Sequence, residues 1–169
     1  MPDKHLNILN HQQIRQKIDR IAYQVLEDNF NEQEIVIAGI LPGGDKIAKR
    51  IKAILDEIAP FQSRLVSIEI DKQSTSLKAL VDFDVQTCSN KVVILVDDVL
   101  NSGKTLAYGF GVFRDVPLKK LRTAVLVDRN HKKFPMTTDY AGIALSTVLK
   151  EHVDVVLDEE GEDDTVYLR

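Results

Sequence analysis

The 169-residue chain has no tryptophan and a single cysteine, Cys88. One cysteine cannot form an intramolecular disulfide, so the sequence agrees with a reducing compartment. No apolar run approaches the length that spans a membrane, and the polar N-terminal residues lack a secretory signal sequence. Repeats and low-complexity segments are also missing. These absences predict a cytoplasmic protein that does not insert into a membrane.

An excess of positive charge is missing too, because the formal net charge is −4. An acidic chain is poorly suited to non-specific nucleic-acid binding, although a local basic patch is compatible with it. The chain does contain 44% hydrophobic and 28% charged residues, which are the proportions of an ordinary globular protein. Its length predicts a single domain with a proper core over residues 1–169.

The most informative stretch begins with an apolar run at residues 92–96, which predicts a strand buried on both faces. Two adjacent carboxylates, Asp97 and Asp98, follow the run. Turn-forming residues come next, and a helix is predicted from Lys104 to about Arg114. The stretch therefore places two acids and a small-residue loop at the carboxyl edge of a parallel sheet, where α/β proteins bind ligands.

Each part of this stretch suits one part of a ribose 5-phosphate. Backbone N–H groups at a helix N-terminus bind phosphate, and the hydroxyl groups of Ser102 and Thr105 can assist them. Gly103 lets the backbone approach a ligand closely. Asp97 and Asp98 can accept hydrogen bonds from a diol or bind Mg²⁺ through water.

Two other interpretations of this stretch compete with a sugar-phosphate site. The Ser-Gly-Lys-Thr sequence could end a nucleotide-binding P-loop, but that motif needs glycine five residues before Gly103, where Asp98 stands. The acids could also be an accidental pair at the end of an ordinary strand. Two adjacent carboxylates there carry a cost of repulsion and desolvation, which favours a functional reason for them.

The rest of the chain alternates between predicted strands and helices. An amphipathic helix is predicted over residues 11–29, with Asn10 as its N-cap. A second helix is predicted after the loop at residues 39–45, and its inward face would consist of Ile47, Ala48, Ile51, Ile54, Leu55 and Ile58. The helix after the central stretch is predicted to pack through Leu106, Phe110 and Phe113. Further strands are predicted at residues 35–38, 65–70 and 121–127, and a terminal hairpin at residues 153–157 and 165–168.

The run Val-Asp-Asp-Val-Leu-x-x-Gly-x-Thr, from Val96 to Thr105, resembles the phosphoribosyl diphosphate (PRPP) binding motif of type I phosphoribosyltransferases. Other segments resemble the family of bifunctional pyrimidine operon attenuators and uracil phosphoribosyltransferases. These segments are Gln13-Ile14-Arg15, Arg20-Ile21-Ala22, Ala48-Lys49-Arg50, Leu126-Val127-Asp128-Arg129 and Asp139-Tyr140. The resemblance extends over nearly the whole chain and is weakest at residues 62–90.

The resemblance implies a three-layer α/β fold, with a central mostly parallel sheet flanked by helices and a small C-terminal hood from about residues 128–169. It also implies an enzyme that transfers ribose 5-phosphate from PRPP to a nucleobase. Uracil is favoured by the resemblance, and the products would then be UMP and pyrophosphate. Mg²⁺ would accompany PRPP, and the family commonly forms homodimers or larger homo-oligomers.

The resemblance assigns a role to each loop of the predicted sheet edge. Asp97 and Asp98 are the expected catalytic residues and reach the metal indirectly, through water or PRPP. The remaining expected groups are a 5-phosphate loop (Asn101, Ser102, Gly103, Lys104, Thr105), a pyrophosphate loop (Leu41, Pro42, Gly43, Gly44) and two residues facing the base (Asp128, Arg129). Residues 71–90 occupy the position of the family's mobile catalytic loop.

This sequence departs from the family pattern at several of these places. Leu41, Pro42 and Gly43 stand where members often carry Lys or Thr-Arg, and the Tyr-Arg-Asp usual in the mobile loop of the uracil subgroup is missing. The lysines that could supply the missing charge are Lys46, Lys72 and Lys78. Asn101 stands where the purine-specific enzymes of the family carry an acid, which favours a pyrimidine or a site with no general base.

Two alternative functions remain. An RNA-binding attenuator of pyrimidine genes is disfavoured, because Asp19 and Asp28 lie on the first helix and Thr137-Thr138 replace part of a basic loop. A PRPP-binding regulator with weak catalysis would agree with the altered pyrophosphate and mobile loops.

Overall fold

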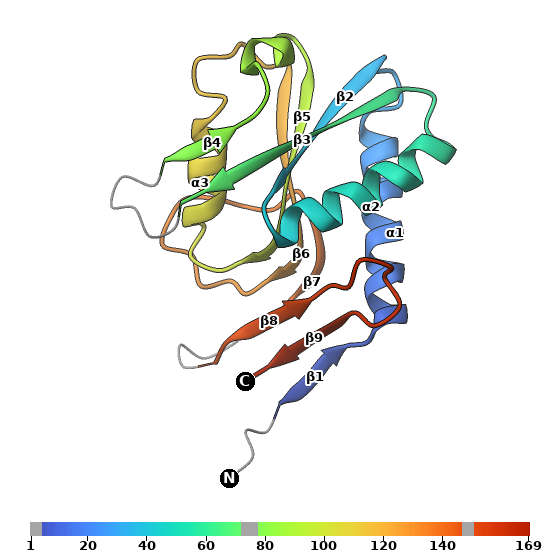
Figure 1. Cartoon of the computed structure of the whole chain (residues 1–169), viewed down its shortest axis with the longest axis vertical. Coiled ribbons are helices and arrows are strands. Elements are labelled where there is room, and N and C mark those ends of the chain that lie inside the picture. The colour runs from blue at the N-terminus through green and yellow to red at the C-terminus, as the bar shows by residue number, and fades with distance from the viewer. Residues whose placement is uncertain (1–4, 72–77, 147–150) are drawn as a thin grey trace.

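The computed structural model describes residues 5–71, 78–146 and 151–169. Its centre is a six-stranded sheet with the strand order β4-β3-β2-β5-β6-β7 (Figure 1). β3 and β4 pair antiparallel, and every other pair is parallel. The strands are β2 (Glu34–Ile40), β3 (Gln62–Ile70), β4 (Ala79–Val81), β5 (Val92–Leu100), β6 (Lys120–Asp128) and β7 (Tyr140–Ala144).

Helices cover both faces of this sheet, which makes the three layers that the family resemblance implied. Residues of β2 and β5 alternate between two clusters of buried side chains, as the period of a strand requires. Ile37 and Ile94 pack in the cluster with α1 (His11–Asp28) and α2 (Gly43–Ile58). Ala38 and Leu95 pack in the cluster with α3 (Lys104–Gly111) on the other face. Burial on both faces explains the continuous apolar runs of these strands.

The first helix begins where the sequence predicted. The Asn10 side chain accepts a hydrogen bond from the Gln13 backbone at 2.8 Å, and the Gln13 side chain accepts one from the Asn10 backbone at 3.0 Å. This capping box satisfies two backbone N–H groups that the first turn leaves without helical partners. Among the described residues, no helix is long and apolar enough to cross a membrane.

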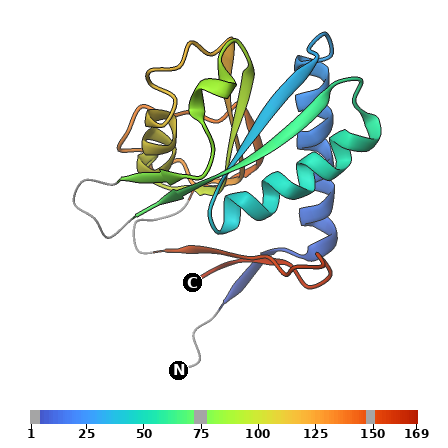
Figure 2. The ribbon, with the colours of Figure 1, turned by 45° about the horizontal axis from the view of Figure 1, so that its top comes forward.

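A second, three-stranded sheet has the order β1-β9-β8 (Figure 2). β8 (Val153–Val156) and β9 (Thr165–Leu168) form the predicted hairpin and pair antiparallel. β1 (Leu6–Leu9), which the sequence did not predict, pairs antiparallel with β9. The two ends of the chain are thereby joined in one small sheet.

Two predicted boundaries around the central stretch are wrong. The strand was predicted to end before Asp97, but β5 continues to Leu100 because its ladder with β6 continues until Leu100 lies opposite Asp128. Asp97 and Asp98 therefore lie within the strand.

The helix that follows was predicted to reach Arg114, and it ends at Gly111. Phe110 was expected to pack inward but is 45% exposed. The reason is that Gly109 lies directly against β2 and β5, which turns Phe110 outward, while Phe113 is buried from the turn after the helix.

The region predicted as one loop over residues 71–90 contains further structure. β4 pairs with β3, and a short 3₁₀ helix (η1, Val85–Cys88) follows it. The Asp84 side chain caps this helix by accepting a hydrogen bond from the Gln86 backbone at 3.0 Å. Lys78 is exposed just before β4, whereas Lys72 lies outside the described residues.

Candidate active site

The residues predicted to bind substrate lie at one edge of the main sheet. Strands β2, β3, β5, β6 and β7 run parallel, so their carboxyl ends meet at the same edge. The segments that leave this edge are residues 41–44, of which the last two begin α2, and the loops at residues 101–103 and 129–139. This arrangement follows the general rule that open α/β sheets bind ligands beyond the carboxyl ends of their strands.

The predicted phosphate loop encloses a hollow of about 60 Å³ lined by residues 97–106. Gly103 has φ = +86°, a left-handed conformation that strains residues with a Cβ atom. A Cβ atom there would also lie 3.2 Å from the Phe134 backbone oxygen. The Ser102 hydroxyl accepts a hydrogen bond from the Lys104 backbone at 3.2 Å. The hollow is small and opens at the first turn of α3, so it suits a compact anion.

The loop between β6 and β7 holds the phosphate loop in place. Backbone N–H groups of Lys133 and Phe134 donate to the Ser102 backbone oxygen at 2.7 and 2.9 Å. The Arg129 backbone donates to the Leu100 backbone oxygen at 3.0 Å. Sequence reasoning missed this support because backbone contacts depend on loop conformation and leave no mark on residue type.

Asp97 and Asp98 lie next to each other but face opposite sides of β5, since successive side chains of a strand alternate. Asp97 is buried, with 6% of its surface exposed, and its Oδ1 accepts a hydrogen bond from the Asp98 backbone at 2.8 Å. Asp98 Oδ1 accepts one from the Val99 backbone at 2.8 Å. The two carboxylates therefore do not chelate one ion together.

The start of α2 packs tightly against these acids. A Cβ atom on Gly43 would overlap with the carboxyl group of Asp98. One on Gly44 would overlap with backbone atoms of Val96 and Asp97. The two glycines thus allow the predicted pyrophosphate loop to touch the acids, and the structure brings together two motifs that lie more than fifty residues apart in sequence.

The small sheet closes one side of this region. Pro42, Gly43 and Asp98 line a cavity of about 120 Å³. Its other lining residues are Lys46 of α2, Val155 of β8 and Leu157, which follows β8. The ammonium group of Lys46 donates to the Leu157 backbone oxygen at 3.0 Å and lies 3.5 Å from a carboxylate oxygen of Glu159. The ammonium group of Lys46 is therefore held by the turn between β8 and β9, which weakens the prediction that Lys46 replaces the missing basic residue of the pyrophosphate loop.

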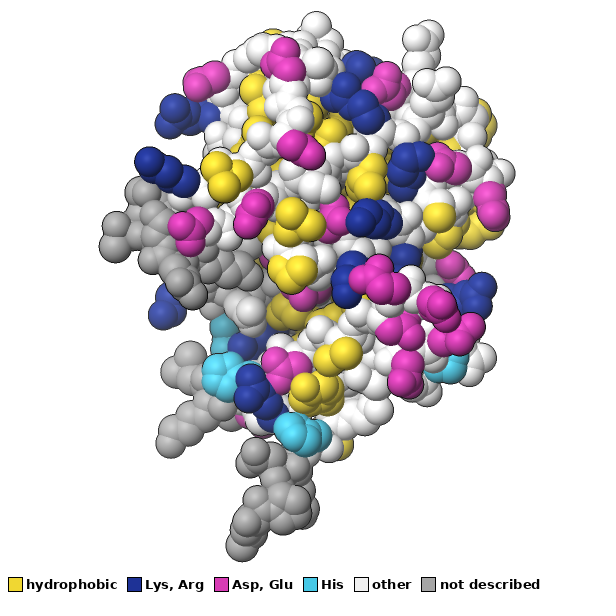
Figure 3. Space-filling view, viewed as in Figure 1, with side chains coloured by type: hydrophobic (Ala, Val, Ile, Leu, Met, Phe, Trp, Pro, Cys, Tyr) yellow, Lys and Arg dark blue, Asp and Glu magenta, His cyan; other side chains and the backbone are white. Residues whose placement is uncertain are grey.

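The turn between β8 and β9 carries four exposed carboxylates, and Figure 3 shows acidic side chains gathered on that side of the molecule. These residues are Glu159, Glu160, Glu162 and Asp163. Backbone N–H groups of the turn donate to the Asp158 carboxylate, which fixes its path. Among the described residues, no cluster of three or more His, Cys, Asp or Glu side chains is arranged to hold a metal ion.

Asp128 and Arg129, the residues predicted to face the base, lie at the end of β6. Asp128 Oδ1 accepts a hydrogen bond from the Asn130 backbone at 2.9 Å, and its Oδ2 accepts one from the Thr138 hydroxyl at 3.2 Å. Arg129 is 7% exposed, and its guanidinium donates to Asn101 Oδ1 at 2.9 Å. The carboxylate of Asp128 is thus held by its own loop, and Arg129 reaches the phosphate loop.

Sequence reasoning did not single out Asp45 and Ser67, two polar residues that connect α2 to β3. Asp45 is buried in the first turn of α2, where its carboxylate accepts a hydrogen bond from the Ser67 hydroxyl at 2.5 Å. Its other oxygen lies 3.0 Å from Lys49 Nζ, and this interaction raises the pKa of Lys49. The negative charge at the N-terminus of α2 also suits the helix dipole, so Asp45 fixes the helix start relative to β3.

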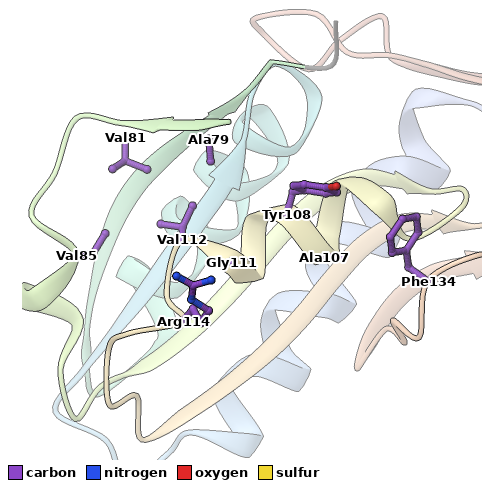
Figure 4. Close-up of a pocket in the computed structure, with 9 residues that line it drawn as sticks. All are labelled: Ala79, Val81, Val85, Ala107, Tyr108, Gly111, Val112, Arg114 and Phe134. Atoms are coloured by element: carbon purple, nitrogen blue, oxygen red, sulfur yellow. The ribbon is translucent and has the colours of Figure 1, made fainter. Parts of the chain in front are cut away.

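A larger cavity of about 620 Å³ lies on the α3 face of the sheet, away from the acids (Figure 4). Side chains from β4, η1 and α3 line it, and Phe134 stands at one end. The lining is mostly apolar, and Arg114 is its charged residue. It lacks the carboxylates and the phosphate loop, so we do not place the reaction there.

Fold and site together define the type I phosphoribosyltransferase class. A family model described as a phosphoribosyl transferase domain matches residues 5–160, and the chain therefore belongs to this family. Its relatives include proteins named bifunctional protein PyrR. The one from Bacillus subtilis (strain 168) is 34% identical over 170 residues, covering 94% of this chain and 93% of the relative. The one from Fusobacterium nucleatum is 33% identical over 171 residues, covering 95% and 96%.

Solved structures of the same class are also similar. A hypoxanthine-guanine phosphoribosyltransferase from Bacillus anthracis matches with a TM-score of 0.71 and 26% identity, covering 82% of this chain and 81% of that one. The hypoxanthine phosphoribosyltransferase of Trypanosoma cruzi matches with a TM-score of 0.75 over 96% and 95% of the two chains, and its 20% identity supports the fold alone. The family resemblance found in the sequence is thus confirmed.

Proposed function

We propose that this phosphoribosyltransferase transfers ribose 5-phosphate from PRPP to uracil, giving UMP and pyrophosphate. The proposal rests on one observation: three segments of the chain meet at the same edge of the main sheet. These are the small-residue loop at residues 101–105, the acids of β5 and the start of α2. Their order along the edge matches the 5-phosphate, ribose and pyrophosphate of PRPP.

Each segment has a defined role in this proposal. Backbone N–H groups of residues 101–105 bind the 5-phosphate, with the hydroxyls of Ser102 and Thr105 and the ammonium of Lys104 beside them. Asp98, whose carboxyl group lies against the start of α2, accepts hydrogen bonds from the ribose hydroxyls, and the buried Asp97 beside it adds negative charge near C1. This charge favours the oxocarbenium-like transition state that forms as pyrophosphate leaves.

The pyrophosphate would lie against residues 41–44. This loop contains no basic side chain, so the backbone N–H groups of Gly43 and Gly44 at the start of α2 must stabilise the leaving group. Mg²⁺ bound with PRPP would supply most of the remaining positive charge. Because Asp97 and Asp98 face opposite sides of β5, oxygen atoms of PRPP would be its main ligands, and Asp98 would contribute through water.

The choice of uracil depends on the family resemblance and on the segment near Asp128. We propose that Asp128 and Arg129 face the base and that residues 128–169 form most of the hood over it, with β1 added to its sheet. Asn101 cannot accept a proton from a purine nitrogen as a carboxylate would, which favours a pyrimidine. We further propose a cytoplasmic homo-oligomer, as the family commonly forms.

The first experiment measures pyrophosphate release from PRPP and Mg²⁺ with uracil, and in parallel with hypoxanthine. We expect turnover with uracil that falls at least about 100-fold in the Asp97→Asn/Asp98→Asn variant, because the charge near C1 is lost. Turnover with hypoxanthine alone would overturn the assignment of uracil. Wild-type protein that turns over neither base would overturn the proposed activity.

A second candidate is a PRPP-binding regulator with weak catalysis. It is favoured by one observation, namely that Lys46, the lysine nearest to the pyrophosphate loop, is engaged by Leu157 and Glu159. Calorimetry with PRPP and Mg²⁺ separates the two functions. Binding without turnover of any base would support the regulator, whereas binding with turnover supports the enzyme.

A further inference from the structure

The first turn of α2 begins without a side-chain cap. Helices leave their first N–H groups without helical partners, and the side chain of the N-cap residue commonly accepts from one of them. The N-cap of α2 is Pro42, which makes no such hydrogen bond. Gly43 and Gly44, the first two residues of the helix, have no polar side chain either. The first side chain of α2 that could accept from these N–H groups is therefore the carboxylate of Asp45.

The carboxylate of Asp45 has partners elsewhere. Its Oδ1 accepts a hydrogen bond from the Ser67 hydroxyl at 2.5 Å, and its Oδ2 lies 3.0 Å from Lys49 Nζ. Ser67 belongs to β3, where it lies opposite Gly39 of β2. A Cβ atom on Gly39 would lie 2.5 Å from the Cα atom of Asp45. The glycine thus lets α2 approach the sheet closely enough for the hydroxyl on β3 to reach the carboxylate.

We propose that Ser67 is a positioning residue for the pyrophosphate of PRPP and acts through Asp45. By holding the carboxylate toward β3, the Ser67 hydroxyl leaves the N–H groups of Gly43 and Gly44 to the pyrophosphate. Without this hydroxyl the carboxylate can turn back onto the first turn, where the helix dipole favours a negative charge. It would then compete with the pyrophosphate and repel it. This inference rests on the proposed function insofar as residues 41–44 bind the pyrophosphate.

Lys49 and Ser67 act on the Asp45 carboxylate in different ways. The ammonium group of Lys49 offsets the negative charge of the carboxylate, so the pair adds no net charge near the pyrophosphate. Ser67 is a neutral donor, so its removal changes the direction of the carboxylate and leaves the sum of the charges as it was. The effect of Ser67 should therefore disappear when position 45 carries no carboxylate.

Calorimetry with magnesium pyrophosphate tests the proposal without requiring catalysis. It compares wild type, Ser67→Ala, Asp45→Ala and the double variant. We expect Ser67→Ala to weaken binding about tenfold, the scale of one charge-assisted hydrogen bond. The double variant should bind at least as tightly as wild type, because alanine at position 45 cannot reach the N–H groups. The affinity for ribose 5-phosphate, which the proposed function places at residues 101–105, should be equal in all four proteins.

Ser63→Ala is the matched control. Ser63 lies four residues before Ser67 on β3, so both side chains point to the same face of the sheet. Its hydroxyl oxygen has no hydrogen-bond partner among the residues that the structure describes. This variant should bind pyrophosphate as wild type does. Ser67→Thr keeps a hydroxyl group at the proposed place, so it should also bind as wild type does.

The double variant separates positioning from a merely structural role. If it binds pyrophosphate as weakly as Ser67→Ala, the loss does not depend on the carboxylate and the proposal is overturned. Unchanged pyrophosphate affinity in Ser67→Ala would also overturn it, as would an equal loss of affinity for ribose 5-phosphate or a wild type that binds no pyrophosphate.

Steady-state kinetics add a second measurement. We expect Ser67→Ala to raise the KM for PRPP while leaving kcat nearly unchanged, and the double variant to restore the KM. A lowered kcat with unchanged KM would contradict the proposal. Restored pyrophosphate binding in the double variant, without transfer to any base by wild type, would support the role of Ser67 while overturning the proposed activity.

Discussion

The first two residues of α2, Gly43 and Gly44, pack against β5 without space for a Cβ atom, but each contacts different atoms of the strand. A methyl group on Gly44 would overlap with backbone atoms of Val96 and Asp97, which cannot move without disturbing the sheet. We expect Gly44→Ala to lower the free energy of unfolding by about 1–3 kcal/mol, the usual cost of overpacking. Urea denaturation at pH 7 measures the change.

Gly43→Ala should behave differently, because its methyl group would overlap with the carboxyl group of the Asp98 side chain rather than with backbone. We expect stability close to that of wild type but a raised KM for PRPP, since the carboxylate must move. Gly111→Ala is the control for both variants, because its added methyl group would meet no atom within 4 Å apart from the backbone of its own helix and its chain neighbours. A Gly43→Ala variant with unchanged KM would contradict a role for this contact in substrate binding.

Tyr140 and Asp28 form a pair whose effect on stability depends on pH. The Tyr140 hydroxyl donates to Asp28 Oδ2 at 2.5 Å, and burial, together with this hydrogen bond, raises the pKa of Tyr140 well above its usual value. Above about pH 10 the unfolded chain loses this proton while the folded chain keeps it, so the free energy of unfolding falls as pH rises.

Tyr140→Phe removes both the hydrogen bond and this titration. We expect it to cost about 1 kcal/mol at pH 7 and progressively less above pH 10, because wild type loses the advantage there. Urea denaturation of both proteins at pH 7 and at pH 10.5 shows whether the difference between their free energies of unfolding shrinks as pH rises. The other tyrosines are present in both proteins, so their titration does not affect this difference. A difference that grows with pH would show that the hydrogen bond is not what distinguishes the two proteins.

The residues expected to bind PRPP could be predicted because they are adjacent in sequence. Asp97, Asp98 and Gly103 lie within one short segment, and their chemistry can be recognised without knowing the fold. The contact between Asn101 and Arg129 could not be predicted in this way. It joins residues 28 positions apart and exists only because β5 and β6 end side by side.

At the scale of elements, one buried ion pair attaches the hairpin of the small sheet to α2. Arg50 donates to both carboxylate oxygens of Asp164, at 2.5 and 3.0 Å, and to the Asp158 backbone oxygen at 2.8 Å. Asp164 is almost completely buried, with 2% of its surface exposed. Removing Arg50 would leave this carboxylate buried without its partner, so we expect Arg50→Met to lower the free energy of unfolding by about 3 kcal/mol.

Lys52→Met on the same helix is the control for this prediction. Lys52 pairs with Asp56 one turn away at 2.6 Å, but both side chains are substantially exposed. Such a pair contributes only about 0.3–0.5 kcal/mol. Urea denaturation that found equal losses for the two variants would mean that the hairpin is attached mainly by apolar contacts.

Which elements the sequence could predict depends on their length and on where their partners lie. α1 and the strands β2 and β5 carry long periodic or continuous apolar patterns, and the sequence predicted all of them. β1 and β4 are 4 and 3 residues long, too short for a pattern to emerge. β1 is a strand only because β9, at the other end of the chain, lies beside it.

At the scale of the whole molecule, ligand binding should stabilise the fold, because the segments expected to hold PRPP come from distant parts of the chain. Residues 41–44 and 101–105 belong to different βα units and meet only in the folded state. We expect PRPP with Mg²⁺ at about 100 times its Kd to add about 2.7 kcal/mol to the free energy of unfolding. Thermal denaturation with PRPP and Mg²⁺, compared with Mg²⁺ alone, measures this gain.

The distribution of charge over the molecule argues against RNA binding, the other activity that the family resemblance implies. On α1, Asp19 and Asp28 are acidic, and the Arg20 guanidinium already donates to the backbone oxygens of Ala141 and Gly142. The chain as a whole is also acidic, with a net charge of −4, and so is poorly suited to non-specific binding of RNA. We therefore expect no binding of the leader RNA of a pyrimidine-synthesis operon at micromolar protein and physiological salt.

Filter binding over a series of salt concentrations tests this expectation, and the salt dependence also gives the number of RNA phosphates that the protein contacts. Each phosphate neutralised by a lysine or arginine steepens the dependence of log K on log salt by about 0.7–0.9. A binding constant that falls steeply with salt would contradict the expectation. If Arg20→Met then made the slope shallower by the amount that corresponds to one phosphate contact, Arg20 would contact RNA. It would then have to leave the backbone oxygens of Ala141 and Gly142. Binding that is weak and independent of salt would instead agree with a protein whose anionic ligand is PRPP alone.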